Sequence, residues 1–355
     1  MWDTGRWPVK HFMKNAVVTG ITGQDAAYLS ELLLSKGYLV FGTYRSSGTQ
    51  DFWRIEELGI KNHAHLRLLE FESTDLTACL NLLEVTGASE IYNLAGQSSA
   101  VTSLANPVGT AQTNGMGVLY LLEAIRLSDR SIRFFQAGSS ELFGQATQVP
   151  QVESTPFYPT SPYGVSKLFA HWATVNYREA FGIFGTSGIF FNHESPLRGA
   201  EFVTRKITNS FARIKLGKQD SVELGNMDSK RDWGYAKDYV LGIWMALQAD
   251  ESDTFVFGTN RMHTVRDFVT MAGDAAGFDL AWQGLAENEV GIDRKSGRTL
   301  VRVNPKFYRP SEIHHRVGNP ERAFRKLGWQ PATSLDQLCK MMVEADILRN
   351  ERSPT

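Results

Sequence analysis

A short apolar run that enters a glycine turn and then a helical pattern lies near the start of the chain, and it restricts the fold more than any other feature. Residues 15–19 are Asn-Ala-Val-Val-Thr, and the turn after them contains Gly20 and Gly23. Leucines then recur at helical spacing between residues 27 and 36, and Gly37 follows at the position of a C-cap. Strand, glycine turn and helix form the first unit of a dinucleotide-binding fold, because the glycines let the backbone approach a pyrophosphate at the helix N-terminus.

The same alternation of strand and helix continues through the first half of the chain. Apolar and β-branched runs predict further strands at residues 39–44, 66–71, 90–94, 132–135 and 186–191. Helical spacing predicts helices at residues 116–127 and 168–179. Strands that alternate with helices predict an α/β protein with a doubly wound parallel (Rossmann) sheet.

The alternation stops near residue 202. Residues 202–216, 239–248, 265–276 and 334–348 read as helices, and residues 254–257 as a returning strand. Residues 231–233 are predicted to lie in a turn, and the charged, Gly-containing segment 286–299 is predicted to be mobile. The last half of the chain is therefore expected to form a smaller C-terminal α/β lobe.

The expected domain organisation follows from this change. Residues 1–13 form an N-terminal extension. Residues 14–191 form the dinucleotide-binding domain, to which about 232–262 return. Residues 192–231 and 263–350 form a substrate lobe, in which recurring basic residues indicate an anionic ligand, namely Lys206, Arg231 and Arg309.

Composition excludes several function classes. The formal net charge is −1, which gives no electrostatic case for binding nucleic acid or an acidic membrane surface. Cys79 and Cys339 lie far apart without metal-ligand spacing, so the sequence predicts neither a metal site nor a disulfide. It predicts a reduced, cytoplasmic protein. No apolar run approaches the ~18 residues of a membrane span. The first fourteen residues lack the apolar core of a signal peptide.

Candidate catalytic residues lie between residues 131 and 167. A buried strand is predicted to end at a polar loop that contains Ser139 and Glu141. Tyr163 and Lys167 are one turn apart on the next helix, so they share a face. An ammonium beside a phenol favours the phenolate, so the pKa of Tyr163 is expected to fall toward the range of a usable base. Glu141 would be a second acid or base.

The end of the second predicted strand bears on the cofactor. Arg45, with Ser46 and Ser47, stands where an acidic residue often binds the ribose hydroxyls of NAD. An arginine with two hydroxyls suits a 2′-phosphate, which favours NADP. Asp75 has two readings: it could accept a hydrogen bond from an adenine amine, or cap the helix that follows.

These motifs together resemble the extended short-chain dehydrogenase/reductase superfamily, and within it the family of GDP-mannose 4,6-dehydratases. The stretches GITGQD, FYPTSPYGVSK, FVTRKIT, LGNMDSKRDWGYAKDY and KFYRPSEI carry the resemblance, which extends from about residue 14 to about residue 348. Members usually have Thr at the position of Ser139, which keeps the hydroxyl, and often a second Arg at the position of Ser46.

The resemblance implies a function and its residues. The reaction is the NADP-dependent dehydration of GDP-D-mannose to GDP-4-keto-6-deoxy-D-mannose, with the cofactor tightly held and recycled. The catalytic residues are Ser139, Glu141, Tyr163 and Lys167. The cofactor-binding residues are Gly20, Thr22, Gly23, Gln24, Asp25, Arg45, Asp75, Leu76, Leu94, Ala95, Tyr163, Lys167, Asn192, His193 and Arg198. The substrate-binding residues are Ser98, Glu141, Asn192, Val203, Lys206, Gly225, Arg231, Arg309 and Glu312.

Alternatives stay open at this point. The substrate could be a related sugar nucleotide such as a GDP-manno-heptose, and the chain could be a non-catalytic NADP-binding regulator. Relatives pair their helices across a two-fold interface, so a homodimer is expected, with a tetramer as the further alternative.

Overall fold

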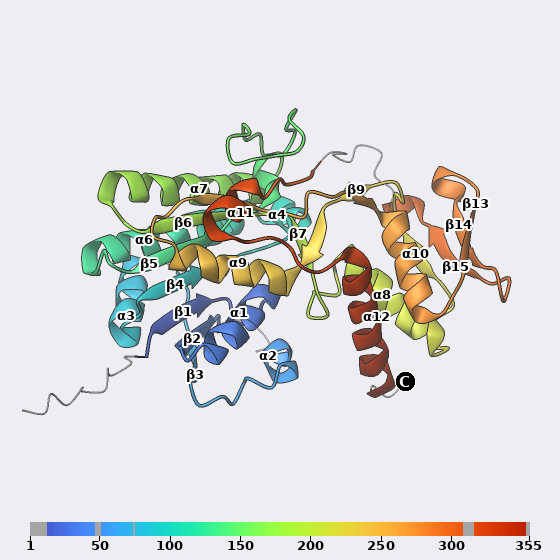
Figure 1. Cartoon of the computed structure of the whole chain (residues 1–355), viewed down its shortest axis with the longest axis horizontal. Helices are drawn as coiled ribbons and strands as arrows, with labels where there is room; N and C mark the ends of the chain where they lie inside the picture. Colours follow the sequence, from blue (N-terminus) through green and yellow to red (C-terminus); the bar gives the residue numbers. More distant parts are fainter. Residues whose placement is uncertain (1–12, 47–50, 74, 308–315, 353–355) are drawn as a thin grey trace, which may run out of the picture.

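A seven-stranded parallel sheet forms the centre of the larger lobe (Figure 1). The computed structural model describes residues 13–46, 51–73, 75–307 and 316–352. The strand order is β11-β6-β5-β4-β1-β2-β3, so the direction of winding reverses between β1 and β4. The strands are β1 (Asn15–Thr19), β2 (Leu39–Tyr44), β3 (Leu66–Glu70), β4 (Glu90–Asn93), β5 (Arg133–Ala137), β6 (Gly185–Phe190) and β11 (Thr254–Phe257). The predicted doubly wound parallel sheet is confirmed, and ligands in such sheets bind where the winding reverses.

Helices cover both faces of this sheet, which explains why its central strands are apolar throughout. Ala16, Val17 and Val18 in β1 are fully buried. One face packs against α1 (Gln24–Ser35), α9 (Ala236–Gln248) and α11 (Glu321–Leu327). The other face packs against α3 (Leu76–Thr86), α6 (Gly117–Ser128) and α7 (Pro162–Phe181).

A smaller lobe contains a second sheet and a separate apolar core (Figure 1). Its four strands lie in the order β13-β14-β15-β8. They are β13 (Leu280–Gln283), β14 (Val290–Asp293), β15 (Thr299–Val303) and β8 (Val222–Leu224). Three helices share that core, namely α8 (Val203–Lys215), α10 (Val265–Ala276) and α12 (Leu335–Arg352).

Two small sheets and one hairpin differ from the sequence predictions. The predicted polar loop at residues 192–199 begins with β7 (Asn192–Glu194), which pairs with β10 (Trp233–Tyr235). The predicted turn at residues 231–233 is divided between β10 and β9 (Lys230–Arg231), and β9 pairs with β12 (His263–Thr264). Residues 286–299, predicted to be mobile, contain β14. Strands of two to four residues are too short to show a period in the sequence, so the predictions of a loop at residues 192–199 and of a turn at residues 231–233 were wrong. The predicted mobility of residues 286–299 stays a prediction.

Two further findings concern the whole chain. Cys79 and Cys339 are free thiols, and both are buried. None of the helices within the described ranges has the length and apolar character that a membrane crossing requires.

Candidate active site

A cavity of about 640 Å³ opens at the carboxyl ends of β1, β2 and β4, beside the reversal of the winding. Ser98, which was predicted to contact substrate, also lines it. Most of the predicted cofactor-binding residues line this cavity, namely Gly20, Thr22, Gly23, Gln24, Asp25, Arg45, Leu94, Ala95 and Arg198. The structure thus brings these predicted residues together at one cavity, and their binding of a cofactor stays a prediction.

Gly20 and the start of α1 form the floor of the cavity. Gly20 has a φ of 74°, and a Cβ atom there would lie 2.9 Å from the Cα of Ala95. Helix α1 begins after Gly23, and among the described residues no side chain caps its first turn. Its first backbone N–H groups are thus free to bind an anion. A close backbone approach and an uncapped helix N-terminus beside a cavity of this size fit the pyrophosphate of a dinucleotide.

Three arginines line the cavity, and two of them are held rigidly. Arg54 donates from Nε to the carbonyl of Leu197 and from Nη1 to the carbonyl of Thr22, both at 2.7 Å. Arg198 lies 2.9 Å from a carboxylate oxygen of Glu194. Together with Arg45 they place three guanidinium groups at the cavity, beside the carboxylates of Asp25, Glu72 and Glu201. The sequence analysis missed Arg54, because it comes from α2 (Trp53–Glu57) and no motif marks it.

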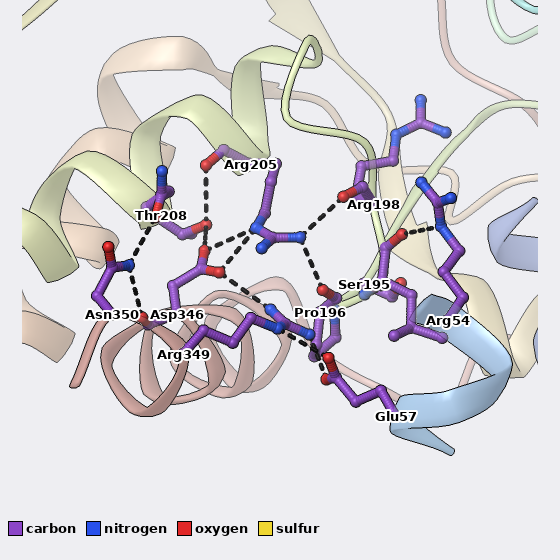
Figure 2. Close-up of polar contacts among 12 residues, drawn as sticks. Arg54, Glu57, Ser195, Pro196, Arg198, Arg205, Thr208, Asp346, Arg349 and Asn350 are labelled. Carbon is purple, nitrogen blue, oxygen red and sulfur yellow. Dashed lines mark hydrogen bonds and ion pairs between the residues drawn. The ribbon is translucent and has the colours of Figure 1, made fainter. Parts of the chain in front are cut away.

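A buried polar network anchors the loop that carries Arg198 (Figure 2). Arg205 on α8 donates to the carbonyls of Pro196 and Arg198, each at 2.9 Å. The same guanidinium pairs with Asp346 of α12, whose side chain is fully buried. Asp346 also accepts a hydrogen bond from the hydroxyl of Thr208 at 2.7 Å. The smaller lobe therefore fixes one wall of a cavity that belongs mainly to the larger lobe.

Asp25 and His193 form a pair beside the cavity. His193 Nε2 lies 2.8 Å from Asp25 Oδ2. Burial alone would lower the pKa of His193, but the Asp25 carboxylate outweighs burial, and the pKa is raised. Burial likewise works to raise the pKa of Asp25, and His193 outweighs it and lowers that pKa. His193 does not itself line the cavity; it holds Asp25, which does.

Asp75 and Leu76 do not line the cavity. The carboxylate of Asp75 accepts a hydrogen bond at 2.9 Å from the backbone N–H of Ala78, so it caps α3. Of the two roles weighed for Asp75, the structure contains the capping one.

Tyr163 and Lys167 lie side by side on α7, as their spacing predicted. Ser161 caps this helix by accepting from the N–H of Gly164 at 3.1 Å, and Pro162 occupies its first turn. The amine of Lys167 donates to the carbonyl of Ala137 at 2.9 Å, at the end of β5. It lies 6.0 Å from the centre of the Tyr163 ring.

The predicted fall in the pKa of Tyr163 is wrong. Tyr163 and Lys167 are only 8% and 6% exposed, so removal of water dominates both groups. Burial raises the pKa of Tyr163 to about 12, against a hydrogen bond with Ser139 that works to lower it. Burial lowers the pKa of Lys167 to about 8. A helical spacing shows which groups are neighbours, but not how much water they lose.

Ser139 and Glu141 follow the end of β5 and face α7. The Ser139 hydroxyl accepts from the backbone N–H of Glu141 at 3.2 Å and caps the short helix η2 (Ser140–Leu142). The backbone carbonyl of Glu141 lies against Gly164, where an added Cβ would come within 2.9 Å of it. The carboxylate of Glu141 makes an ion pair with Arg316. A hydroxyl, a carboxylate and a phenol thus converge at one strand end.

Apart from Ser98 and Glu141, which belong to the larger lobe, the predicted substrate residues are dispersed over the smaller lobe and the connection to it. Asn192 lies in β7 and Arg231 in β9. Val203 and Lys206 lie in the first turns of α8, and the Lys206 amine is 4.3 Å from the ring centre of Phe307. Gly225 packs against the backbone of Phe307. Arg309 and Glu312 lie outside the described residues.

Asn114 and Arg316 are further residues of the site that the sequence analysis missed. Asn114 is buried in a π-helical turn before α6. Its amide donates to the carbonyl of Gln97 and accepts from the N–H of Gln97, both at 2.9 Å, and so fixes the loop after β4. No motif in the sequence marks Asn114. None marks Arg316 either, since its partner is 175 positions away in the chain.

The parallel sheet and the cavity at its strand ends define a class of protein, the doubly wound dinucleotide-binding (Rossmann) proteins. Solved structures of this class share the fold. The structure of dTDP-glucose 4,6-dehydratase from Bacillus anthracis in complex with NAD has a TM-score of 0.79 at 17% identity, and covers 96% of this chain and 98% of that one. RMD from Pseudomonas aeruginosa complexed with NADPH has a TM-score of 0.73 at 20% identity, and covers 95% and 100%.

The sequence comparisons identify the family within that class. The family model described as GDP-mannose 4,6 dehydratase matches residues 17–342. GDP-mannose 4,6 dehydratase of Cricetulus griseus is 46% identical over 340 residues, which cover 94% of this chain and 91% of the relative. GDP-mannose 4,6-dehydratase of Yersinia enterocolitica is 44% identical and covers 94% of each. The chain belongs to the GDP-mannose 4,6-dehydratase family.

Proposed function

We propose that this protein is a hydro-lyase that converts GDP-D-mannose to GDP-4-keto-6-deoxy-D-mannose with NADP as its recycled cofactor. The observation that carries the proposal is the convergence of Ser139, Glu141 and Tyr163 at the end of β5, beside the dinucleotide-sized cavity. Relatives that bear the name of this activity support the choice of reaction and of substrate.

Tyr163 and Ser139 act on the 4-hydroxyl of the sugar. Ser139 holds O4 by a hydrogen bond, and Tyr163 moves the O4 proton. Because burial keeps Tyr163 in its neutral phenol form, it works through a positioned hydrogen-bond chain rather than as a free phenolate. Lys167 orients the ribose of the cofactor and supplies positive charge beside Tyr163.

A nicotinamide cofactor, when bound, accepts hydride from C4 and returns it to C6, so that the whole reaction involves no net redox change. Gly20, Gly23 and Asp25 would hold it, together with Arg198. Two solved structures of the same fold contain NAD or NADPH. Arg45 lies at the cavity wall, and this supports NADP as the partner of this chain.

Glu141 carries out the elimination. The 4-ketone acidifies the C5 proton, and the Glu141 carboxylate takes that proton. The electrons of the C5–H bond form the C5–C6 double bond as the C6–O bond breaks, and Glu141 gives its proton to the departing hydroxyl, which leaves as water. A simple epimerase or reductase needs Tyr163 and Lys167 but no carboxylate at this position, so Glu141 distinguishes the dehydratase from them.

The smaller lobe would hold the nucleotide. We assign the sugar-nucleotide lobe to residues 192–231 and 263–350, with the dinucleotide-binding domain at residues 14–191 and about 232–262. The bidentate fork of arginine suits a diphosphate. Residues proposed to contact substrate are Ser98, Asn192, Val203, Lys206, Gly225, Arg231, Arg309 and Glu312. We also propose that the protein is cytoplasmic and that it forms a homodimer or a tetramer.

A panel of GDP-, UDP- and CDP-sugars that includes a GDP-manno-heptose tests the activity by loss of the mass of water. The Glu141→Gln variant tests the assignment of the base, since glutamine keeps the shape and the hydrogen bonding but cannot take a proton. The variant should bind GDP-mannose and form reduced nicotinamide without releasing 6-deoxy product. Solvent deuterium should enter C5 in the wild type and not in the variant. Dehydration by Glu141→Gln at the wild-type rate would remove Glu141 from the mechanism, and a chain that dehydrates no sugar nucleotide would be a non-catalytic binder.

A further inference from the structure

Glu141 has one charged partner among the described residues, and that partner comes from the C-terminal part of the chain. The Nη1 group of Arg316 donates to Oε1 of Glu141. The two side chains are 14% and 27% exposed, so the pair is largely shielded from water. Within the described ranges, Oε2 of the same carboxylate makes no hydrogen bond, so one oxygen is held and the other is available.

Hydrogen bonds fix the backbone directly after Arg316. Val317 donates its N–H to the amide oxygen of Gln151 at 2.9 Å, and its carbonyl accepts from the N–H of Gln151 at 2.8 Å. The next residue, Gly318, donates to Oδ2 of the buried Asp232 at 3.0 Å. Arg316 therefore reaches Glu141 from an anchored segment, unlike an arginine on a free surface loop.

A second observation concerns the Nε–H group of Arg316. Its Nε–H group is buried and has no hydrogen-bond partner among the described residues. A buried N–H group without a partner costs free energy, and such groups are uncommon in folded proteins. The Nε–H group of the guanidinium thus has no partner among the described residues, whereas its Nη1 group donates to Glu141.

We propose that Arg316 is a positioning residue for the elimination step, an inference that rests on the proposed function. By engaging Oε1 it orients the carboxylate so that Oε2 meets the C5 proton of the sugar. Its charge also favours the second half of the proton transfer. Once Glu141 has taken the C5 proton it is neutral and loses its attraction to Arg316. Transfer of that proton to the departing C6 hydroxyl restores the ion pair.

The 4-ketone drives the first half of the transfer, since it acidifies the C5–H bond before Glu141 acts. Breaking the C6–O bond receives no such help from the ketone alone. The net effect of Arg316 is therefore expected to appear in the departure of water, after the substrate is bound and oxidised.

Arg316→Leu and Arg316→Lys test the inference, with Arg322→Leu as the matched control. Arg322 lies on α11 in the same C-terminal segment and pairs with Glu153 and Asp253 at 3.5 and 3.4 Å, away from the site. Arg316→Leu should lose about 10- to 100-fold in kcat with KM little changed, the range expected for one charge-assisted hydrogen bond. Reduced nicotinamide should accumulate during turnover. Arg316→Lys should recover most of the loss, and Arg322→Leu should behave as the wild type.

Circular dichroism and thermal unfolding establish that each variant is folded. If Arg316→Leu does not fold, Arg316→Gln replaces it, and the comparison with Arg316→Lys decides between charge and shape. A folded variant without the charge that keeps the wild-type kcat and accumulates no reduced nicotinamide overturns the inference and leaves the proposed function intact. A wild-type protein that does not dehydrate GDP-mannose overturns the proposed function, and this inference with it.

Discussion

Replacement of Gly20 by alanine tests the dinucleotide cradle, and Gly37 offers a matched control. Both glycines have a left-handed backbone, with φ of 74° and 81°. A Cβ at Gly20 would lie 2.9 Å from the Cα of Ala95, whereas a Cβ at Gly37 would meet nothing within 4 Å. The two variants therefore share the cost of the backbone conformation and differ in the contact with Ala95.

The magnitudes follow from these two terms. Alanine in a left-handed conformation costs about 1–2 kcal/mol, and this applies to both variants. Overpacking against a neighbour that cannot move away adds about 1–3 kcal/mol, and this applies only to Gly20→Ala. Gly20→Ala should lower the free energy of unfolding by about 2–5 kcal/mol, against about 1–2 kcal/mol for Gly37→Ala.

Cofactor binding separates the variants further. Separation of the Gly20 turn from Ala95 displaces the floor of the cavity, so Gly20→Ala should bind NADP⁺ at least about tenfold more weakly, equivalent to about 1.4 kcal/mol. Gly37→Ala should bind as the wild type does. Urea unfolding and a direct titration with NADP⁺ measure the two quantities. Equal unfolding free energies together with unchanged NADP⁺ affinity in Gly20→Ala would refute the role assigned to this turn.

Four further predictions concern the catalytic group, the cofactor, pH and assembly. Tyr163→Phe should fold and bind ligands but lose turnover by about 10²-fold or more, and a near-normal rate would exclude Tyr163 as the acid or base. NADP⁺ should bind more tightly than NAD⁺, and Arg45→Ala should reduce that difference in a titration; equal affinities in the wild type would contradict it. Burial raises the pKa of Asp232 to about 6 in the folded state, so the folded protein binds the Asp232 proton more tightly than the unfolded chain does. The free energy of unfolding should therefore fall as pH rises from about 4 to 6, and Asp232→Asn should flatten that slope in thermal unfolding. Light scattering at micromolar concentration should show at least a dimer, and Trp172→Lys, at a 54% exposed position of α7, should weaken it.

The sequence by itself determined the class of fold, and it predicted which groups are reactive. The strand, glycine turn and helix at residues 15–36 predicted the start of the parallel sheet, and the structure confirms it. The spacing of Tyr163 and Lys167 placed both on one face of α7. These features are local, since a helical or strand period and a glycine turn depend on residues a few positions apart. The same locality explains why the strands of two to four residues were missed.

The tertiary structure decided how those groups behave. The pKa of Tyr163 rises instead of falling, because the removal of water by surrounding elements outweighs its neighbours on the helix. Glu141 pairs with Arg316, and Arg54 donates to the glycine turn. The partners in each contact are far apart in the sequence, so no local spacing could predict either contact. Desolvation and long-range ion pairs depend on which distant segments pack together. A local sequence pattern does not indicate which distant segments pack together. The pKa of Tyr163 and the partner of Glu141 could therefore be seen only in the folded structure.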